Sequence, residues 1–133
     1  MSEKIYSLWQ KVIHPLLFGF IGAALIIHAT SKYGPALSHD SAAYLFASET
    51  LLDGKGLLYF GYDTPFVQWP PGFSLLLALF GKRGAELVSL ARYINSAAFG
   101  VLAFLSSRWL VTNLKNYFFA LLGSLAILFS IPL

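Results

Sequence analysis

The sequence predicts an all-α membrane protein with about three transmembrane helices and one long extracytoplasmic loop. Of its 133 residues, 57% are hydrophobic and only 11% are charged, whereas an average soluble domain carries about a quarter charged residues. The mean hydropathy of +0.68 agrees with this, and aromatic residues make up 17% of the chain. Three apolar stretches approach the roughly 20 residues that a helix needs to cross a hydrocarbon core of about 30 Å.

The charged and sulfur-containing residues exclude several classes of function. Nine Lys and Arg against six Asp and Glu give a net charge of +3, and these few basic residues are too scattered to form a nucleic-acid surface. We therefore expect no nucleic-acid partner. Because the chain has no cysteine, it contains no disulfide, no thiolate nucleophile and no cysteine-based metal site.

The first predicted span covers residues 12–30, between Lys11 and Lys32, with Pro15 in its first turn. Proline is tolerated there because the first N–H groups of a helix have no helical partner. The apolar run is longer than a usual signal-peptide core, and no small-x-small cleavage site follows it. We expect a retained signal anchor.

A loop of residues 31–86 follows, and we expect its first part to contain a helix over residues 40–53. Ser38 or Asp40 can cap the start of this helix, and Gly54 can end it. The aromatic-rich residues 55–69 are predicted to form an ordered loop lying on the membrane surface.

A second short helix is predicted over residues 71–80, with Pro70 forcing an extended entry and Pro71 at the first helical position. Ten residues extend only about 15 Å, so this helix should be interfacial or re-entrant. Lys82 and Arg83 follow it, and if the helix did cross the bilayer, the topology beyond it would invert.

The remaining spans are predicted over residues 87–111 and 117–133. Arg92 and Arg108 lie near the two ends of the first of these, where their heads can reach the interface. The last span is still apolar at Leu133. We therefore expect residues 1–133 to be a single membrane domain that is incomplete by itself.

The positive charges predict the orientation of the chain in a plasma (inner) membrane. Lys4 and Lys11 precede the first span, Arg108 lies near the end of the second span, and Lys115 follows it. Short cytoplasmic segments carry an excess of Lys and Arg. The N-terminus should therefore be cytoplasmic and loop 31–86 extracytoplasmic.

Asp40 is the first candidate catalytic residue. A carboxylate at a helix start is favoured by the unpaired N–H groups and the helix dipole, and Tyr44 follows one turn later on the same side. Two interpretations stay open, a helix cap and a catalytic carboxylate at the mouth of an outward cleft. His14 and His28, within or beside the first span, are interpreted as hydrogen-bonding residues without a catalytic role.

Several motifs in the loop form one longer pattern. Asp40-Ser41-Ala42-Ala43-Tyr44 leads to Gly54, and an aromatic stretch then ends in Trp-Pro-Pro-Gly-Phe at residues 69–73. In this order and spacing they resemble the first external loop of GT-C class glycosyltransferases, in particular the glycosyltransferase 39 type that includes protein O-mannosyltransferases and lipid A aminoarabinose transferases. Residues 91–100 look like the start of the second membrane helix of those enzymes, so the resemblance extends from the first span to the third.

The resemblance implies transfer of a sugar from a polyprenyl-phosphate carrier to a protein, lipid or glycan acceptor. The residue matching Asp40 acts at the acceptor in the family, where a base takes the hydroxyl proton as the new bond forms. Attack opposite the leaving phosphate would invert the anomeric centre.

Other residues of the pattern have candidate binding roles. Tyr44 and Trp69 are candidates to stack on a sugar ring, with interface anchoring as the alternative. Pro70 and Pro71 would shape the acceptor cleft. The basic residue that holds the phosphate is not decided by the sequence: the candidates are Arg92, Lys55, Lys82 and Arg83.

No cofactor is predicted, and the participation of a divalent metal is left open. Many family members carry an acidic residue directly after the catalytic Asp, whereas this chain has Ser41. We expect the chain to be the N-terminal portion of such an enzyme and inactive alone, with the C-terminal part possible as a separate partner chain. The alternative is a small non-enzymatic membrane protein, such as an assembly or lipid-handling subunit.

Overall fold

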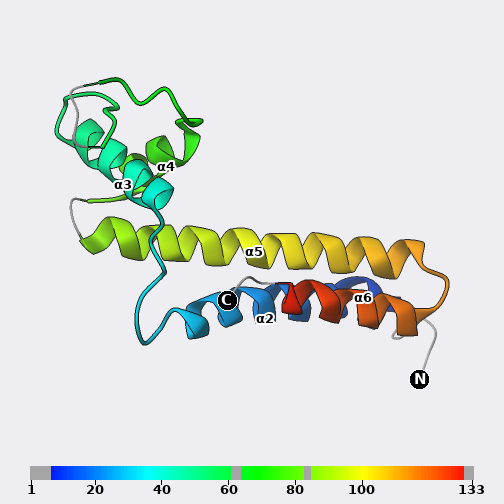
Figure 1. Cartoon of the computed structure of the whole chain (residues 1–133). Coiled ribbons are helices and arrows are strands. Elements are labelled where there is room, and N and C mark those ends of the chain that lie inside the picture. Colours follow the sequence, from blue (N-terminus) through cyan, green and yellow to red (C-terminus); the bar gives the residue numbers. More distant parts are fainter. Residues whose placement is uncertain (1–6, 61–63, 83–84, 131–133) are drawn as a thin grey trace. The chain divides into compact units, whose positions relative to one another are not determined.

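The computed structural model describes residues 7–60, 64–82 and 85–130, and these residues form helices joined by loops (Figure 1). The order is η1 (Trp9–Ile13, a π-helix), α2 (His14–Ala29), α3 (His39–Leu52), α4 (Gly72–Phe80), α5 (Ala85–Asn113) and α6 (Tyr117–Phe129). Within the described chain the only β pairing is an isolated bridge between Leu58 and Pro65. The predicted all-α class is confirmed.

The chain divides into two compact units. The bundle unit contains η1, α2, α6 and the part of α5 from Ile94 onward, and the loop unit is Tyr33–Tyr93. Each unit is described by itself below.

Two helices are long and apolar enough to cross a membrane, Trp9–Ala29 with 21 residues and Glu86–Asn113 with 28. Only 22% of the most apolar window of each is buried, which is unlike a core helix of a soluble protein. Large side chains such as Phe20, Phe118 and Trp109 are exposed. This distribution favours helices that face lipid.

The first of these helices begins earlier than the sequence predicts, because η1 precedes α2 without a break. Pro15 lies in the first turn of α2. Because η1 directly precedes α2, this proline follows a helical turn and does not begin a helix. Proline cannot donate a backbone hydrogen bond, and its ring clashes with the carbonyl four residues earlier. The π-turn, in which the N–H of His14 bonds to the carbonyl of Trp9, accommodates this break in the α-helical pattern.

The bundle unit packs through small residues. Gly19 and Gly22 of α2 lie against Gly100 and Ala103 of α5, where an added Cβ at Gly100 would be 2.9 Å from the carbonyl oxygen of Gly19. Ser96 Oγ donates to the carbonyl of Ala23 over 2.8 Å. Close approach of helix backbones at small residues is typical of membrane helix pairs.

α6 has 13 residues, which extend about 20 Å and fall short of a bilayer core of about 30 Å. Asn116 caps its start by accepting a hydrogen bond from the N–H of Phe118. The end of the predicted third span, residues 131–133, lies outside the described residues.

In the loop unit, α3 and α4 pack together. Ser38 is the N-cap of α3, and Gly54 and Gly56 beyond its end have φ values of +74° and +83°, which favour glycine. Pro71 is the N-cap of α4 and not its first helical residue. The structure has helices at both places in this loop where the sequence predicts them, and their starts differ from the predicted ones by one residue.

Candidate functional site

Asp40 lies in the first turn of α3, one turn before Tyr44. The cap of this helix is Ser38, whose Oγ accepts a hydrogen bond of 3.2 Å from the N–H of Ser41. Asp40 Oδ1 is 3.9 Å from Nδ1 of His39, and the side chain of Asp40 is 60% exposed. An exposed ion pair at this distance contributes little to stability. Because its side chain is mostly exposed, the carboxylate of Asp40 is accessible at the start of the helix.

Tyr44 lies in a cluster of aromatic rings. Its ring centroid is 5.4 Å from that of Phe66, 5.7 Å from Phe73 and 6.4 Å from Trp69. Trp69 also stacks on Tyr59, with the ring planes at 21° and the centroids 5.7 Å apart. The structure therefore brings together the two predicted sugar-stacking residues, Tyr44 and Trp69, although each also packs against other rings.

The cluster rests on a small buried core of Ala43, Ala47 and Phe66. Because two alanines face the loop, the aromatic rings can approach the helix closely. Ser74 of α4 is buried and donates a hydrogen bond of 2.9 Å to the carbonyl of Tyr44. This contact fixes α4 at the middle of α3.

Backbone hydrogen bonds order the loop between α3 and α4. The N–H of Phe66 donates to the carbonyl of Leu57 over 3.0 Å. The hydroxyl of Thr50 accepts from the N–H of Leu58 and donates to the carbonyl of Ala47. The predicted ordered loop is present on both sides of residues 61–63, which lie outside the described residues.

The remaining predicted residues are placed as follows. Pro70 and Pro71 are exposed at the entry to α4. Arg92 is half-buried on the part of α5 that belongs to the loop unit, with its Cζ 5.8 Å from the ring centroid of Tyr93. Lys55 Nζ lies 3.8 Å from Asp53 Oδ2, and Arg83 lies outside the described residues.

The described residues contain no group of three His, Asp or Glu side chains that could hold a metal ion. Asp40 and its neighbour His39 are the acidic and imidazole side chains at the start of α3. A single exposed carboxylate can accept a proton from a nearby hydroxyl.

A second polar group lies inside the bundle unit, around a histidine that the sequence analysis interpreted as a hydrogen-bonding residue. His14 of α2 is 4% exposed, and its Nδ1 is 2.8 Å from the hydroxyl of Tyr117 while its Nε2 is 3.3 Å from Ser124 Oγ. Ser124 also bonds to Ser107 of α5 over 3.0 Å. These four side chains, here called the His14 network, connect α2, α5 and α6.

A neutral imidazole satisfies this arrangement. In the tautomer with the proton on Nε2, the Tyr117 hydroxyl donates to Nδ1 and Nε2–H donates to Ser124, whose hydroxyl donates to Ser107. The signal in the sequence for this network was His14 itself, an ionisable residue within a predicted span. Its partners lie more than 90 residues away along the chain, so the sequence could not identify them.

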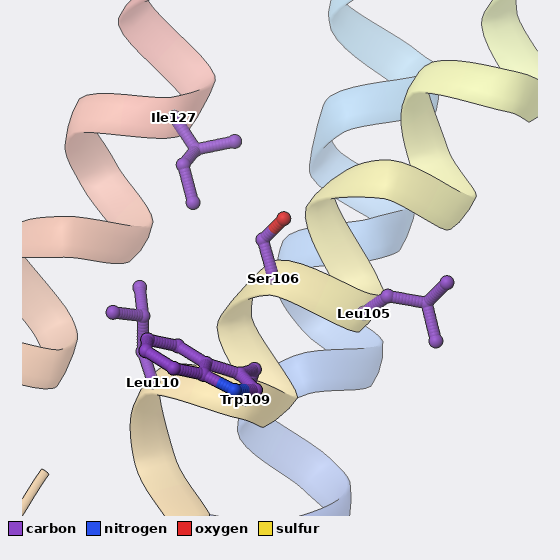
Figure 2. A pocket seen from close by; sticks show the side chains of 5 residues that line it. All are labelled: Leu105, Ser106, Trp109, Leu110 and Ile127. Atoms are coloured by element: carbon purple, nitrogen blue, oxygen red, sulfur yellow. The ribbon is translucent and has the colours of Figure 1, made fainter. Parts of the chain in front are cut away.

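The cavities formed by described residues include two in the bundle unit. The first, about 480 Å³ between α5 and α6, is lined mainly by apolar side chains and contains no ionisable group (Figure 2). The second, about 420 Å³, is lined by Gln10, Val111, Leu114, Lys115, Asn116 and Tyr117. Neither is lined by a residue that the sequence predicted to act on substrate.

Comparison with known proteins adds no relative: no protein-family model, no curated protein and no solved structure matches the chain.

Proposed function

We propose that this chain forms the first membrane helices and the first external loop of a GT-C class glycosyltransferase. Its substrate would be a sugar linked to a polyprenyl phosphate, which reaches the loop from the bilayer. The proposal is supported by the sequence resemblance and by one structural observation. An exposed carboxylate, Asp40, lies in the first turn of the helix whose Tyr44 packs against Trp69.

The identity of the helix cap strengthens the catalytic interpretation of Asp40. A carboxylate at a helix start is usually explained as a cap, but here Ser38 has that role. The remaining structural benefit of Asp40 is its interaction with the helix dipole, about 0.3–1 kcal/mol for an exposed group. Asp40 can therefore serve as the general base for an acceptor hydroxyl without a loss of the cap.

The proposed topology has three spans, with the N-terminus in the cytoplasm and loop 31–86 outside. α4 supports an interfacial position because it buries Ser74 and Leu77 and exposes Leu79 and Phe80, at 73% and 67%. An apolar outer face on a helix of nine residues is suited to the boundary between headgroups and acyl chains.

The second candidate function is a non-enzymatic assembly or lipid-handling subunit. It is favoured by the mutual packing of the aromatic rings, since Tyr44, Tyr59, Phe66 and Trp69 all contact one another or a buried core. In that case the cluster stabilises the loop and binds no sugar.

The two functions are distinguished by an Asp40→Asn substitution in the chromosomal gene, so that any partner chain is present. Membranes are supplied with radiolabelled polyprenyl-phosphate mannose or aminoarabinose, and label in proteins, lipids and glycans is counted. We expect transfer to fall at least about hundredfold, as loss of a general base predicts.

Asp53→Asn is the matched control, because it removes the same charge at the other end of α3 and should leave transfer unchanged. Retained transfer in Asp40→Asn would refute the role of Asp40 as base. Equal transfer in wild-type membranes and in membranes from a deletion strain would favour the non-enzymatic subunit.

A further inference from the structure

The 420 Å³ cavity of the bundle unit has the lining of a binding site for an anion. Gln10 comes from η1, and Lys115, Asn116 and Tyr117 come from the turn between α5 and α6 and the start of α6. These side chains offer two carboxamides, an ammonium group and a phenol, while no carboxylate lines the cavity. The carboxamides and the ammonium group can donate several hydrogen bonds to one phosphate group.

The charge around the cavity has one sign. Residues 7–32 and 94–130 contain four basic residues, Lys11, Lys32, Arg108 and Lys115, and no Asp or Glu. Lys115 lines the cavity, and Lys11 follows Gln10 directly in the chain. An anion entering here meets no acidic side chain of the described bundle unit.

Two walls of the cavity are held in place by hydrogen bonds. Asn116 Oδ1 accepts from the N–H of Phe118 over 2.9 Å, which leaves the amide –NH₂ of Asn116 as a donor. The Tyr117 hydroxyl is fixed by the buried His14, which is in turn linked to Ser124. The His14 network therefore orders one wall before any ligand binds, which lowers the entropic cost of binding.

The position of the cavity along the helices points to a lipid as the source of the anion. Gln10 lies at the start of the apolar helix Trp9–Ala29, and Lys115 follows the end of the apolar helix Glu86–Asn113. Trp9 lies at the start of the first of these helices, Trp109 lies near the end of the second, and Tyr117 begins α6. Aromatic residues are enriched at such positions near the membrane interface. A phosphate at this depth belongs to a headgroup, and basic pockets between membrane helices are suited to anionic headgroups.

We propose that this cavity binds the phosphate group of an anionic lipid headgroup. Lys115 pairs with the phosphate charge, and the carboxamides of Gln10 and Asn116 donate to its oxygens. This site is independent of Asp40 and of the proposed transferase activity.

The test is lipid retention by the full chain, measured by native mass spectrometry after purification in detergent. The probes are phosphatidylglycerol and, as the zwitterionic comparison, phosphatidylcholine. We expect the wild type to retain phosphatidylglycerol in preference to phosphatidylcholine. In Lys115→Gln the affinity for phosphatidylglycerol should be lower by about fivefold, the contribution that one lysine makes near an anionic membrane surface. Gln10→Leu, which keeps every charge, should also weaken binding.

Lys32→Gln is the matched control, because it removes an equal charge beyond the other end of α2 and should bind as the wild type does. Equal losses in Lys115→Gln and Lys32→Gln, or equal retention of the two lipids, would overturn the proposal. Displacement of phosphatidylglycerol by inorganic phosphate at a similar concentration would assign the cavity to free phosphate and overturn the lipid source.

Discussion

At the scale of single residues, the start of α3 separates structural from chemical roles. Ser38 and Asp40 are both good capping residues by type, and the sequence left the choice between them open. The backbone decides it, since Ser38 has extended dihedral angles, φ −82° and ψ 169°, and Asp40 already lies inside the helix. Only a residue with such non-helical angles can turn its side chain back to the free N–H groups.

This assignment predicts different effects of two substitutions on α3. Ser38→Ala should cost about 1 kcal/mol of local stability, because the N–H of Ser41 loses its acceptor. Asp40→Asn should cost less, since only the interaction with the helix dipole is reduced. Amide hydrogen exchange of residues 39–52 in the detergent-solubilised chain measures both, with faster exchange expected in Ser38→Ala. Equal acceleration in the two variants would show that Asp40 shares the capping role.

His14 shows where residue-level interpretation stops. A histidine near the end of a predicted span was expected to form hydrogen bonds, and it does. Its partners, Tyr117 and Ser124, lie in the first and third turns of α6, a helix whose packing partner the sequence does not specify. Periodicity identifies the face of a helix, but it does not identify the neighbour.

At the scale of elements, the pair α2 and α5 depends on residues without large side chains. Gly19, Gly22, Ser96 and Gly100 let the two backbones approach closely enough for direct contacts with backbone carbonyls. In lipid, apolar burial does not drive helices together, so close packing and interhelical hydrogen bonds do. The small residues of α2 and α5 therefore determine which faces of the two helices pack together, as a hydrophobic stripe does in a soluble protein.

Gly100→Ala should destabilise the chain by roughly 1–3 kcal/mol, as overpacking does. The added methyl group would lie 2.9 Å from the carbonyl oxygen of Gly19 and 3.0 Å from the Cβ of Ala23, and neither can move without the helix. Thermal unfolding in detergent measures the loss as a lower Tm.

Gly123→Ala is the matched control for this substitution. Its added methyl group would meet the Cδ1 end of Leu110 at 2.9 Å, and a flexible side chain can change rotamer. We expect the Tm of Gly123→Ala to equal or exceed that of the wild type, since alanine favours a helix over glycine. A Tm lowered equally by both substitutions would contradict close backbone packing at Gly100.

At the scale of the whole molecule, two helices are long and apolar enough to cross a membrane, and the lysines and arginines at their ends are the basis of the proposed orientation. α6 is the shortest span of the proposed topology. Its 13 residues reach about two thirds of the way across a bilayer core.

Single-cysteine variants test the topology directly, because the chain has no native cysteine. We expect a membrane-impermeant maleimide to label Val67→Cys and Ser130→Cys in intact cells. Leu8→Cys and Asn113→Cys should be labelled only after the membrane is permeabilised. Labelling of Val67→Cys and Asn113→Cys from the same side would contradict a crossing by α5. Labelling of Ser130→Cys and Asn113→Cys from the same side would leave a two-span chain.

The sequence by itself determined the helical class, the two long apolar helices and the two short helices of the loop. These features depend on local composition, proline and glycine positions and capping residues, which act within a few turns of chain. The backbone angles of the folded chain decided between Ser38 and Asp40 as the cap of α3. The tertiary structure decided that Tyr44 and Trp69 meet and that His14 is linked to Ser124. Those contacts join residues whose approach depends on how separate elements pack, and no local pattern encodes that packing.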